Sequence, residues 1–250
     1  FLPISSTAHL ILVPYFFNWP DPGLAFDVAL HFGTLIAVIT YFFNDWINIF
    51  KLAFRRRIDI LNSTADKYGN NVLWFLIIAT IPGVLVGYFL ENAAENKLRN
   101  PLFIAFTLVF FGVILYAVDR YSKIKKEFSR ISLFDSIIIG LSQAIAIIPG
   151  VSRSGATITA GRFLKIDRIS AARFSFLLST PIILGAVVLK IPELIKNINE
   201  PGLLLAIFSS AVSGYLAIKY LLHHIQSRDY SFFFWYRLIL ATIILIFYLS

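Results

Sequence analysis

The sequence predicts an all-α integral membrane protein with six transmembrane helices and two re-entrant helix–loop–helix hairpins. Three observations lead to this fold class. Hydrophobic residues make up 58% of the 250 residues and charged residues only 14%, whereas soluble domains are about half apolar and a quarter charged. Six apolar segments are long enough to cross a bilayer. Two more apolar regions are interrupted by proline and hydroxyl residues.

The first interrupted region opens the chain, with the letters FLPISSTAHLILVPYFF. Irregular backbone at membrane depth is tolerated only where protein buries it or where it lines a wet cavity. We therefore expect a re-entrant hairpin in this region. Three spans follow it, at Leu24–Phe43, Val72–Leu90 and Pro101–Val118.

The second interrupted region, Leu133–Leu164, is too long for one span and too short for two spans joined by a normal loop. Its break at Pro149-Gly150 opens a helix, so that backbone N–H groups can point into a cavity. We expect a second re-entrant hairpin here. Three further spans follow, at Ala171–Lys190, Leu203–Leu222 and Phe232–Leu249.

The two interrupted regions resemble each other. LPISSTAH (residues 2–9) and IPGVSRSG (residues 148–155) share an apolar-Pro-x-x-Ser core. A hairpin does not cross the membrane and three spans cross it an odd number of times, so the second half enters from the opposite face. We predict one membrane domain with inverted repeat halves of about 1–119 and 133–250, whose hairpins meet near the midplane. The alternative is that so short a match is chance.

Lysine and arginine gather on one face of this six-span arrangement, and this predicts its orientation. That face is expected to be cytoplasmic, with the N-terminal hairpin opening to the outside. Because the net charge of +8 comes from short loops, it indicates membrane orientation and no nucleic-acid partner. The predicted cytoplasmic face carries 13 basic residues, Lys51, Arg55, Arg56, Arg57, Lys67, Arg120, Lys123, Lys125, Lys126, Arg130, Lys165, Arg168 and Arg228, and the other face three, Lys97, Arg99 and Lys196.

Arg153 is the sharpest functional signal, because it lies at membrane depth in PGVSRSGATI, residues 149–158. An arginine at the bilayer centre costs at least about 2.5–3.5 kcal/mol on insertion scales. A guanidinium can hold two phosphate oxygens, and the helix that resumes after the break adds free N–H groups, so the loop suits an anionic ligand. The alternative is that Arg153 pairs with an acid or with carbonyl groups and only joins helices. The residues expected around the ligand are Gly150, Ser152, Ser154, Gly155 and Thr157.

The N-terminal region offers Ser5, Ser6, Thr7 and His9 within five residues. A serine followed three positions later by a histidine can be a nucleophile with its base or acid. A buried histidine beside hydroxyls is often only a satisfied polar group. Placed opposite the Arg153 loop by the repeat, this motif becomes a candidate reaction centre.

Five other polar side chains fall within the apolar segments. Gln143 is placed with the ligand-binding residues. Asp27 and His31 are an i,i+4 pair on one helix face, and two ligands are too few to predict a metal site. We expect Asp27 at the outer boundary and His31 in the cavity. Arg162 and Arg173 flank a predicted cytoplasmic turn, where snorkelling to the interface is expected.

At these motifs the sequence resembles the undecaprenyl-diphosphate phosphatase family, also called the bacitracin-resistance (BacA/UppP) family. FLPISSTAHLIL resembles the first family signature and PGVSRSGATI the second. FDVALHFGTLIAV and ARFSFLLSTPIILGA also look like family segments. The likeness covers nearly the whole chain.

The resemblance implies an enzyme of the bacterial inner membrane that removes one phosphate from a C55 isoprenoid diphosphate and so recycles the lipid carrier of cell-wall synthesis. It implies Ser6 as nucleophile assisted by His9, with Arg153 clamping the diphosphate and a divalent cation, magnesium or calcium, as cofactor. The active site would open toward the extracytoplasmic side. The expected partners are undecaprenyl diphosphate and membrane lipids, and the oligomeric state stays open, a homodimer included.

Two departures from the family pattern affect this expectation. The family has two glutamates just before FLP, its metal or general-base groups, and a chain that begins at Phe1 lacks both. The chain as given is therefore expected to be impaired. Ala8 stands where the family usually has glycine, so its methyl group is expected to crowd the loop.

Three functions remain in competition at this point. The chain is expected to hydrolyse the diphosphate, either through a phosphoserine on Ser6 or by direct attack of water. A polyprenyl-phosphate transporter or flippase is the rival, because inverted repeats with broken helices are typical of transporters. A structural scaffold explains the spans but leaves Arg153 without a role.

Overall fold

The computed structural model describes residues 1–20, 24–54, 71–196, 200 and 202–249, and its regular structure is helical throughout this part of the chain. Among these residues the one extended contact is an isolated parallel bridge between Lys126 and Ile166. The elements are α1 (Ser6–Phe17), α2 (Leu24–Tyr41), α3 (Phe43–Ala53), α5 (Val72–Lys97), α6 (Pro101–Tyr121), the 3₁₀ turn η1 (Phe128–Arg130), α7 (Leu133–Ile145), α8 (Arg153–Phe163), α9 (Arg168–Lys196), α10 (Leu203–Ser227) and α11 (Ser231–Leu249).

The predicted spans are confirmed. Helices α5, α6, α9, α10 and α11 are long and apolar enough to cross a membrane. Helices α2 and α3 are apolar enough together to make a sixth crossing if they form one broken span, and they bend by 70° relative to each other next to Phe42. The protein is therefore an all-helical multi-pass membrane protein.

The two interrupted regions fold as short helices. Residues 133–163 form α7 and α8, which are joined by the break at 146–152, as expected. The N-terminal region has one helix, α1, preceded by five non-helical residues, where a helix–loop–helix hairpin was expected.

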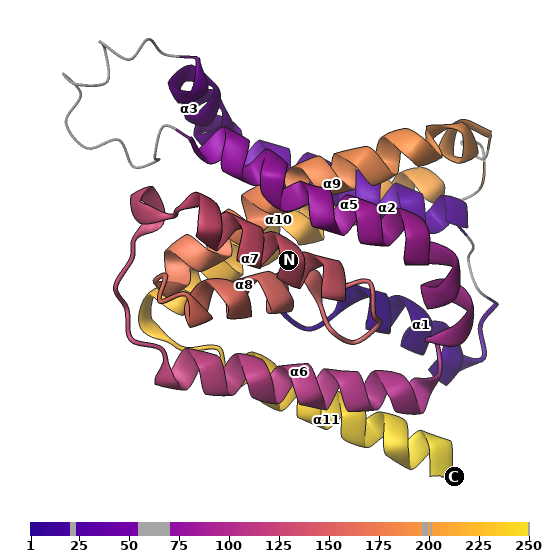
Figure 1. Cartoon of the computed structure of the whole chain (residues 1–250). Helices are drawn as coiled ribbons and strands as arrows, with labels where there is room; N and C mark the ends of the chain where they lie inside the picture. Colours follow the sequence, from indigo (N-terminus) through magenta and orange to yellow (C-terminus); the bar gives the residue numbers. More distant parts are fainter. Residues whose placement is uncertain (21–23, 55–70, 197–199, 201, 250) are drawn as a thin grey trace.

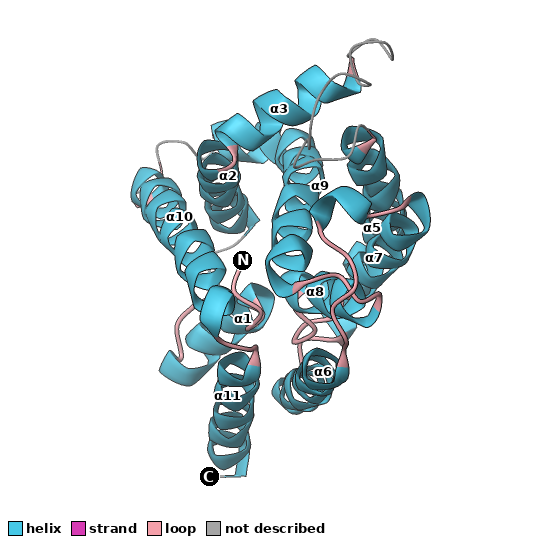
Figure 2. Cartoon of the chain, turned by 90° about the vertical axis from the view of Figure 1, so that its left-hand side faces the viewer, coloured by secondary structure: helices cyan, strands magenta, loops and turns pink. Residues whose placement is uncertain are grey.

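Helices α1 and α8 lie in the interior of the molecule. Figures 1 and 2 show them between α6 and α11 on one side and α2, α9 and α10 on the other. Helix α8 is suited to this place because its buried positions are mostly small, among them Ser154, Gly155, Ala156, Ala160 and Gly161. Such residues let the surrounding helices approach closely without a large apolar side chain.

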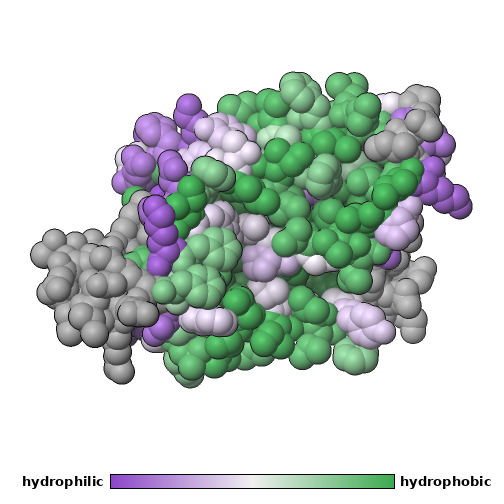
Figure 3. All heavy atoms as spheres, turned by 90° about the horizontal axis from the view of Figure 1, so that it is seen from above, coloured by the Kyte–Doolittle hydropathy of each residue, from purple (hydrophilic) through white to green (hydrophobic). Residues whose placement is uncertain are grey.

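The outer surface is apolar between two polar ends. Large hydrophobic side chains such as Phe89, Phe106, Phe208 and Ile246 are more than 60% exposed on the long helices. In Figure 3 hydrophobic residues cover the middle of the molecule and hydrophilic residues gather at both ends. A band of this kind matches the hydrocarbon layer of a bilayer.

A buried ionic network closes the end of the molecule where α6 finishes. Asp119 is 3% exposed and accepts hydrogen bonds from Arg162 Nε at 2.7 Å and from Arg168 Nε at 2.9 Å. Arg162 Nη1 also donates to the Ile166 carbonyl at 2.6 Å. The backbone N–H of Tyr230 reaches the Asp119 carboxylate at 3.3 Å. The network thus ties α6, α8, α9 and the start of α11 together.

The predicted snorkelling of Arg162 and Arg173 is wrong. Arg162 is 1% exposed and fully engaged with Asp119, because α6 supplies a buried carboxylate beside it. Arg173 pairs with Asp45 of α3 and lies 5.4 Å from the centre of the Phe42 ring. Arg55, Arg56, Arg57 and Lys67, which were counted for orientation, lie outside the described residues, and the orientation stays a prediction.

Candidate active site

Helices α1 and α8 begin in the same way. Each is preceded by a serine with positive φ, 71° at Ser5 and 70° at Ser152. Each cap hydroxyl accepts a backbone N–H three residues on, from Ala8 at 3.4 Å and from Gly155 at 3.2 Å. The repeat motif is therefore matched by local structure, but in a register one residue away from the sequence alignment.

The shifted register changes which residues correspond. Ser6, the first residue of α1, is the counterpart of Arg153, the first residue of α8. Ala8 is the counterpart of Gly155 and is fully buried, so the position that departs from the family pattern is a packed one.

The two loops are in direct contact. The Gly150 N–H donates to Ser5 Oγ at 3.2 Å, and Ser154 Oγ donates to the Leu2 carbonyl at 3.2 Å. Helices α1 and α8 start at this contact and run to opposite ends of the molecule (Figure 1). Their free N–H groups and positive dipole ends are consequently close together in the interior.

Arg237 of α11 joins the two loops, and sequence reasoning missed it. Its side chain is 0% exposed. Nε donates to the Pro3 carbonyl at 2.8 Å and Nη2 to the Val151 carbonyl at 3.3 Å. Nη1 has no partner among the described residues. The signal was available, because an arginine inside an apolar span is by default a functional candidate.

Gly150 and Gly155 allow the close packing that the prediction assigned to them. Gly150 has φ +92° and a Cβ there would overlap the Thr107 hydroxyl of α6. That hydroxyl donates to the Pro149 carbonyl at 2.7 Å and fixes the break. A Cβ at Gly155 would come within 2.5 Å of Arg237 Nη2. Both glycines therefore shape the loop rather than present side chains.

Arg153 lies in the interior without a protein partner. Its side chain is half-buried, and no hydrogen bond or ion pair joins its guanidinium to any other described residue. His31 of α2 is within electrostatic range of Arg153. The alternative in which Arg153 pairs with an acid or with carbonyls is thus not seen, and its donors remain available to an anion.

Ser6 and Thr7 are both exposed in the first turn of α1. Neither hydroxyl has a hydrogen-bond partner among the described residues. They are the accessible hydroxyls of the two loops, because Ser5, Ser152 and Ser154 are buried and hydrogen-bonded.

His9 is occupied by two other groups. Nδ1 donates to the Ser5 carbonyl at 2.7 Å, and Nε2 then accepts from the Tyr236 hydroxyl at 2.6 Å. This geometry orients the loop before α1 and does not join His9 to Ser6. A role for His9 in proton transfer stays a prediction.

Two predicted ligand-binding residues face other helices. Thr157 is 1% exposed, donates to the Arg153 carbonyl at 2.8 Å and contacts Ser175 Oγ of α9 at 2.6 Å. Gln143 is buried against Gly83 of α5, and both of its amide atoms lack partners among the described residues. Thr157 supports Arg153 from behind, whereas the Gln143 side chain has no hydrogen bond to either loop among the described residues.

The described residues do not by themselves suit a divalent cation. They contain no group of three histidine, aspartate or glutamate side chains that could hold a metal ion. The polar groups at the loop contact are hydroxyls, a guanidinium and backbone N–H groups, which favour an anion over a cation. The divalent cofactor stays a prediction that depends on the glutamates of the family pattern.

The arrangement can bind and attack a phosphorylated group. An unpartnered guanidinium and two helix N-termini provide positive potential in a protein interior, where screening by water is weak. An exposed serine hydroxyl on the neighbouring loop provides a nucleophile.

Comparison with known proteins agrees with this chemistry. The family model described as bacitracin resistance protein BacA matches residues 1–243. A protein of Moorella thermoacetica is 48% identical over 98% of this chain and 90% of its own length, and one of Pelotomaculum thermopropionicum is 47% identical over the same shares. A protein of Geobacter metallireducens is 42% identical over 98% of this chain and 92% of its own length. Each of the three is named undecaprenyl-diphosphatase.

Proposed function

This chain belongs to the bacitracin resistance protein BacA family, and we propose that it is an undecaprenyl-diphosphatase whose reaction centre lies where the loops before α1 and α8 meet. It hydrolyses a membrane-bound isoprenoid diphosphate to the monophosphate and inorganic phosphate. The observation that carries this conclusion is identity of 42–48% with undecaprenyl-diphosphatases along nearly the whole chain.

Arg153 binds the diphosphate in this proposal. Its guanidinium has no partner among the described residues and lies at the start of α8, so charge and helix dipole act on the same anion. Thr157 and Ser175 hold the backbone behind Arg153 through the 2.8 Å and 2.6 Å hydrogen bonds. Preorganisation of this kind stabilises charge that develops on phosphoryl oxygens.

Ser6 is the proposed nucleophile. Its oxygen attacks the terminal phosphorus, the bond from that phosphorus to the bridging oxygen breaks, and the prenyl monophosphate leaves. The Ser6 proton passes to a base, which is either a glutamate of the family pattern or His9 after its Nε2 has left the Tyr236 hydroxyl. Water then cleaves the phosphoserine and releases inorganic phosphate. In the alternative, water attacks the phosphorus directly and Ser6 only orients it.

A bound magnesium or calcium ion would supply further neutralisation of phosphate charge. Because the described residues offer no carboxylate cluster for it, no step of this mechanism depends on the ion.

The prenyl tail lies in the hydrocarbon layer around the helices in this proposal. Large hydrophobic side chains cover the outer faces of α5, α6, α10 and α11, where hydrocarbon would lie. We place the protein in the bacterial inner membrane, with its active site toward the extracytoplasmic side, where it regenerates the lipid carrier of cell-wall synthesis. Assembly as a homodimer is compatible with this proposal.

The test is phosphate release from undecaprenyl diphosphate by the purified full-length protein in detergent. Arg153→Lys keeps one positive charge but loses the planar pair of donors, so kcat/KM is expected to fall about 100-fold, in the range of one lost transition-state donor. The kcat/KM of Ser6→Ala is expected to fall further. The matched controls are Arg130→Lys and Ser213→Ala, whose side chains are exposed and far from both loops in the sequence.

Wild-type turnover by Arg153→Lys would remove Arg153 from the site. Turnover by Ser6→Ala would assign the attack to water. A transporter would instead move the lipid phosphate across the liposome membrane without releasing phosphate. Hydrolysis in detergent with no such flux supports the phosphatase.

A further inference from the structure

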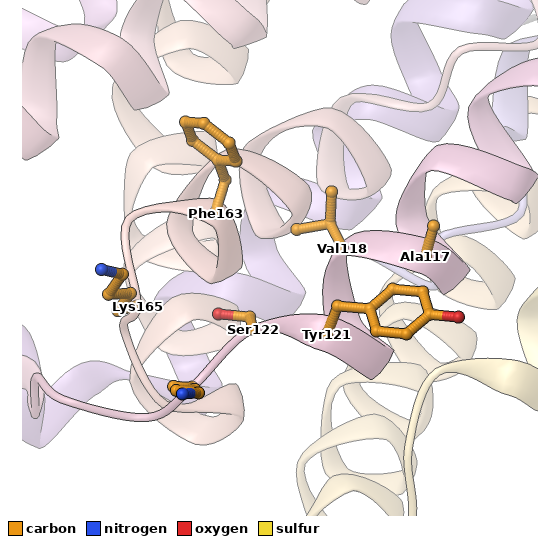
Figure 4. A pocket seen from close by; sticks show the side chains of 7 residues that line it. Ala117, Val118, Tyr121, Ser122, Phe163 and Lys165 are labelled. Atoms are coloured by element: carbon orange, nitrogen blue, oxygen red, sulfur yellow. The ribbon is translucent and has the colours of Figure 1, made fainter.

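A hollow lies at the opposite end of α8 from Arg153. It holds about 590 Å³, which is within the usual range for small-ligand sites. Figure 4 shows its labelled side chains on the end of α6 and just after it, at the end of α8 and in the turn that follows α8. The lining consists of Ala117, Val118, Tyr121, Ser122, Lys123, Phe163 and Lys165.

The hollow has an apolar side at the level of the membrane boundary. Val118 and Ala117 belong to the last turn of a helix that is apolar enough to span, and that helix ends at Tyr121. Phe163, the last residue of α8, is 70% exposed. A tyrosine at the end of a span is typical of the interface between hydrocarbon and water.

The other side of the hollow is basic. Lys123 and Lys165 are both exposed, and neither has an acidic partner among the described residues. Lys126 next to them is different, because its Nζ is held by Asp135 at 2.7 Å. The Asp119 carboxylate on the last turn of α6 is already paired with Arg162 and Arg168. No ion pair with a described residue therefore neutralises Lys123 or Lys165.

Backbone hydrogen bonds join the segment after Lys123 to the turn that contains Lys165. Lys165 has φ 68°, a conformation that a lysine adopts only at a cost. Its carbonyl accepts the N–H groups of Lys125 at 2.9 Å and Lys126 at 3.1 Å, and the Asp167 N–H donates to the Lys126 carbonyl at 2.9 Å. Ser122 Oγ also donates to the Arg162 carbonyl. Two segments about forty residues apart are thus joined into one rigid rim.

We propose that this hollow binds an anionic phospholipid of the bilayer. The lipid phosphate lies between Lys123 and Lys165, and an acyl chain lies against Val118 and Phe163. A basic pocket at a span end, open on its apolar side, is the pattern that selects lipid head groups. This site is separate from the proposed phosphatase centre and does not depend on it. Because α8 carries Arg153 at its other end, the lipid contacts the helix that forms the centre.

The experiment is a lipid titration of the full-length protein in detergent, read by native mass spectrometry. Phosphatidylglycerol and phosphatidylcholine are added separately and the bound lipid is counted. The wild-type protein is expected to retain phosphatidylglycerol preferentially. Lys123→Gln with Lys165→Gln is expected to weaken its retention roughly 25-fold, since each charge near a membrane surface contributes about fivefold.

Two matched variants separate the hollow from general surface charge. Lys51→Gln with Arg130→Gln removes the same charge from two exposed positions that do not line the hollow and is expected to leave retention unchanged. Val118→Trp fills the hollow, keeps both lysines and is expected to displace the lipid.

Three outcomes would overturn the proposal. The first is equal retention of the two lipids by the wild-type protein. The second is an equal loss in the Lys51/Arg130 variant, which would leave only diffuse attraction. The third is displacement of phosphatidylglycerol by prenyl monophosphate at much lower concentration, which would assign the hollow to the product of the reaction. Each readout is independent of phosphate release.

Discussion

Gly150 is the residue on which the geometry of the central loop depends most directly. Gly150→Ala would put a side chain at φ +92° and into the Thr107 hydroxyl. The backbone strain alone is expected to cost about 1–3 kcal/mol, and the overlap adds to it. Thermal unfolding in detergent should show a lower Tm together with reduced hydrolysis.

Gly87→Ala is the control for this substitution. Gly87 lies in α5 with no atom within 4 Å of an added Cβ. Its replacement is expected to leave Tm unchanged or to raise it slightly, because alanine favours a helix by up to about 1 kcal/mol. If Gly150→Ala behaved like this control, the break at 146–152 would not be a tightly packed feature.

At the scale of single residues, the sequence singled out the two loops that the structure brings into contact, but it could not predict the partner of every side chain in them. Arg153 was predictable because a charge inside an apolar region requires a reason. The buried state of Ser5, Ser152 and Thr157 was not, because it depends on which hydroxyls cap the two helices. The double engagement of His9 depends on Tyr236, which is 227 residues away. Such long-range partners leave no local pattern.

At the scale of elements, α7 depends on a charged cap at its start. Asp135 accepts hydrogen bonds from Lys126 Nζ at 2.7 Å and from the Ser132 N–H at 2.9 Å. Burial would raise the pKa of the Asp135 carboxyl, but the bonds from Lys126 and Ser132 outweigh it and hold that pKa below its usual range. The cap is therefore ionised at neutral pH.

A pH dependence follows from the direction of this shift. A carboxyl with a lowered pKa contributes stability above its unfolded-state pKa and loses it as the pH falls through the folded-state pKa. The Tm of the wild-type protein should fall between roughly pH 5 and pH 3. Asp135→Asn should have a Tm lower by about 2–4 °C at pH 7 and a shallower fall. If Tm changed with pH in the same way in the wild type and in Asp135→Asn, the role of this cap would be contradicted. The control is Glu127→Gln, which removes an exposed carboxylate.

Element positions were largely predictable because hydrophobic length sets them. The six spans recur within a few residues of their expected bounds, apart from the continuation of the first span into α3 after a 70° bend. The correspondence between the starts of α1 and α8 was not predictable. The shared Pro-x-x-Ser pattern matches Ser6 with Ser152, whereas the backbone conformation of the caps matches Ser5 with Ser152. Ser5 and Ser152 share positive φ, which the letters do not record.

At the scale of the whole molecule, the ionic network around Asp119 joins α6, α8, α9 and the start of α11. Asp119→Asn leaves Arg162, which is 1% exposed, without its carboxylate. Breaking a buried ion pair from one side typically costs about 3–5 kcal/mol. A marked fall in Tm is expected, whereas Glu200→Gln at an exposed site should have no effect. A small change in Asp119→Asn would mean that water replaces the carboxylate at that end.

The hydrogen bonds that Arg237 makes to both loops help to distinguish an enzyme from a transporter. One side chain holds the carbonyls of Pro3 and Val151, and Ser5 meets Gly150 beside it. Any rocking of one half past the other would have to break these bonds in the protein interior, where each broken bond costs about 1–3 kcal/mol. A transporter needs its two halves to move past each other in every cycle, whereas a hydrolase needs its two loops held in a fixed relative position. The hydrogen bonds of Arg237 therefore favour hydrolysis at a fixed site over transport of the lipid through the protein.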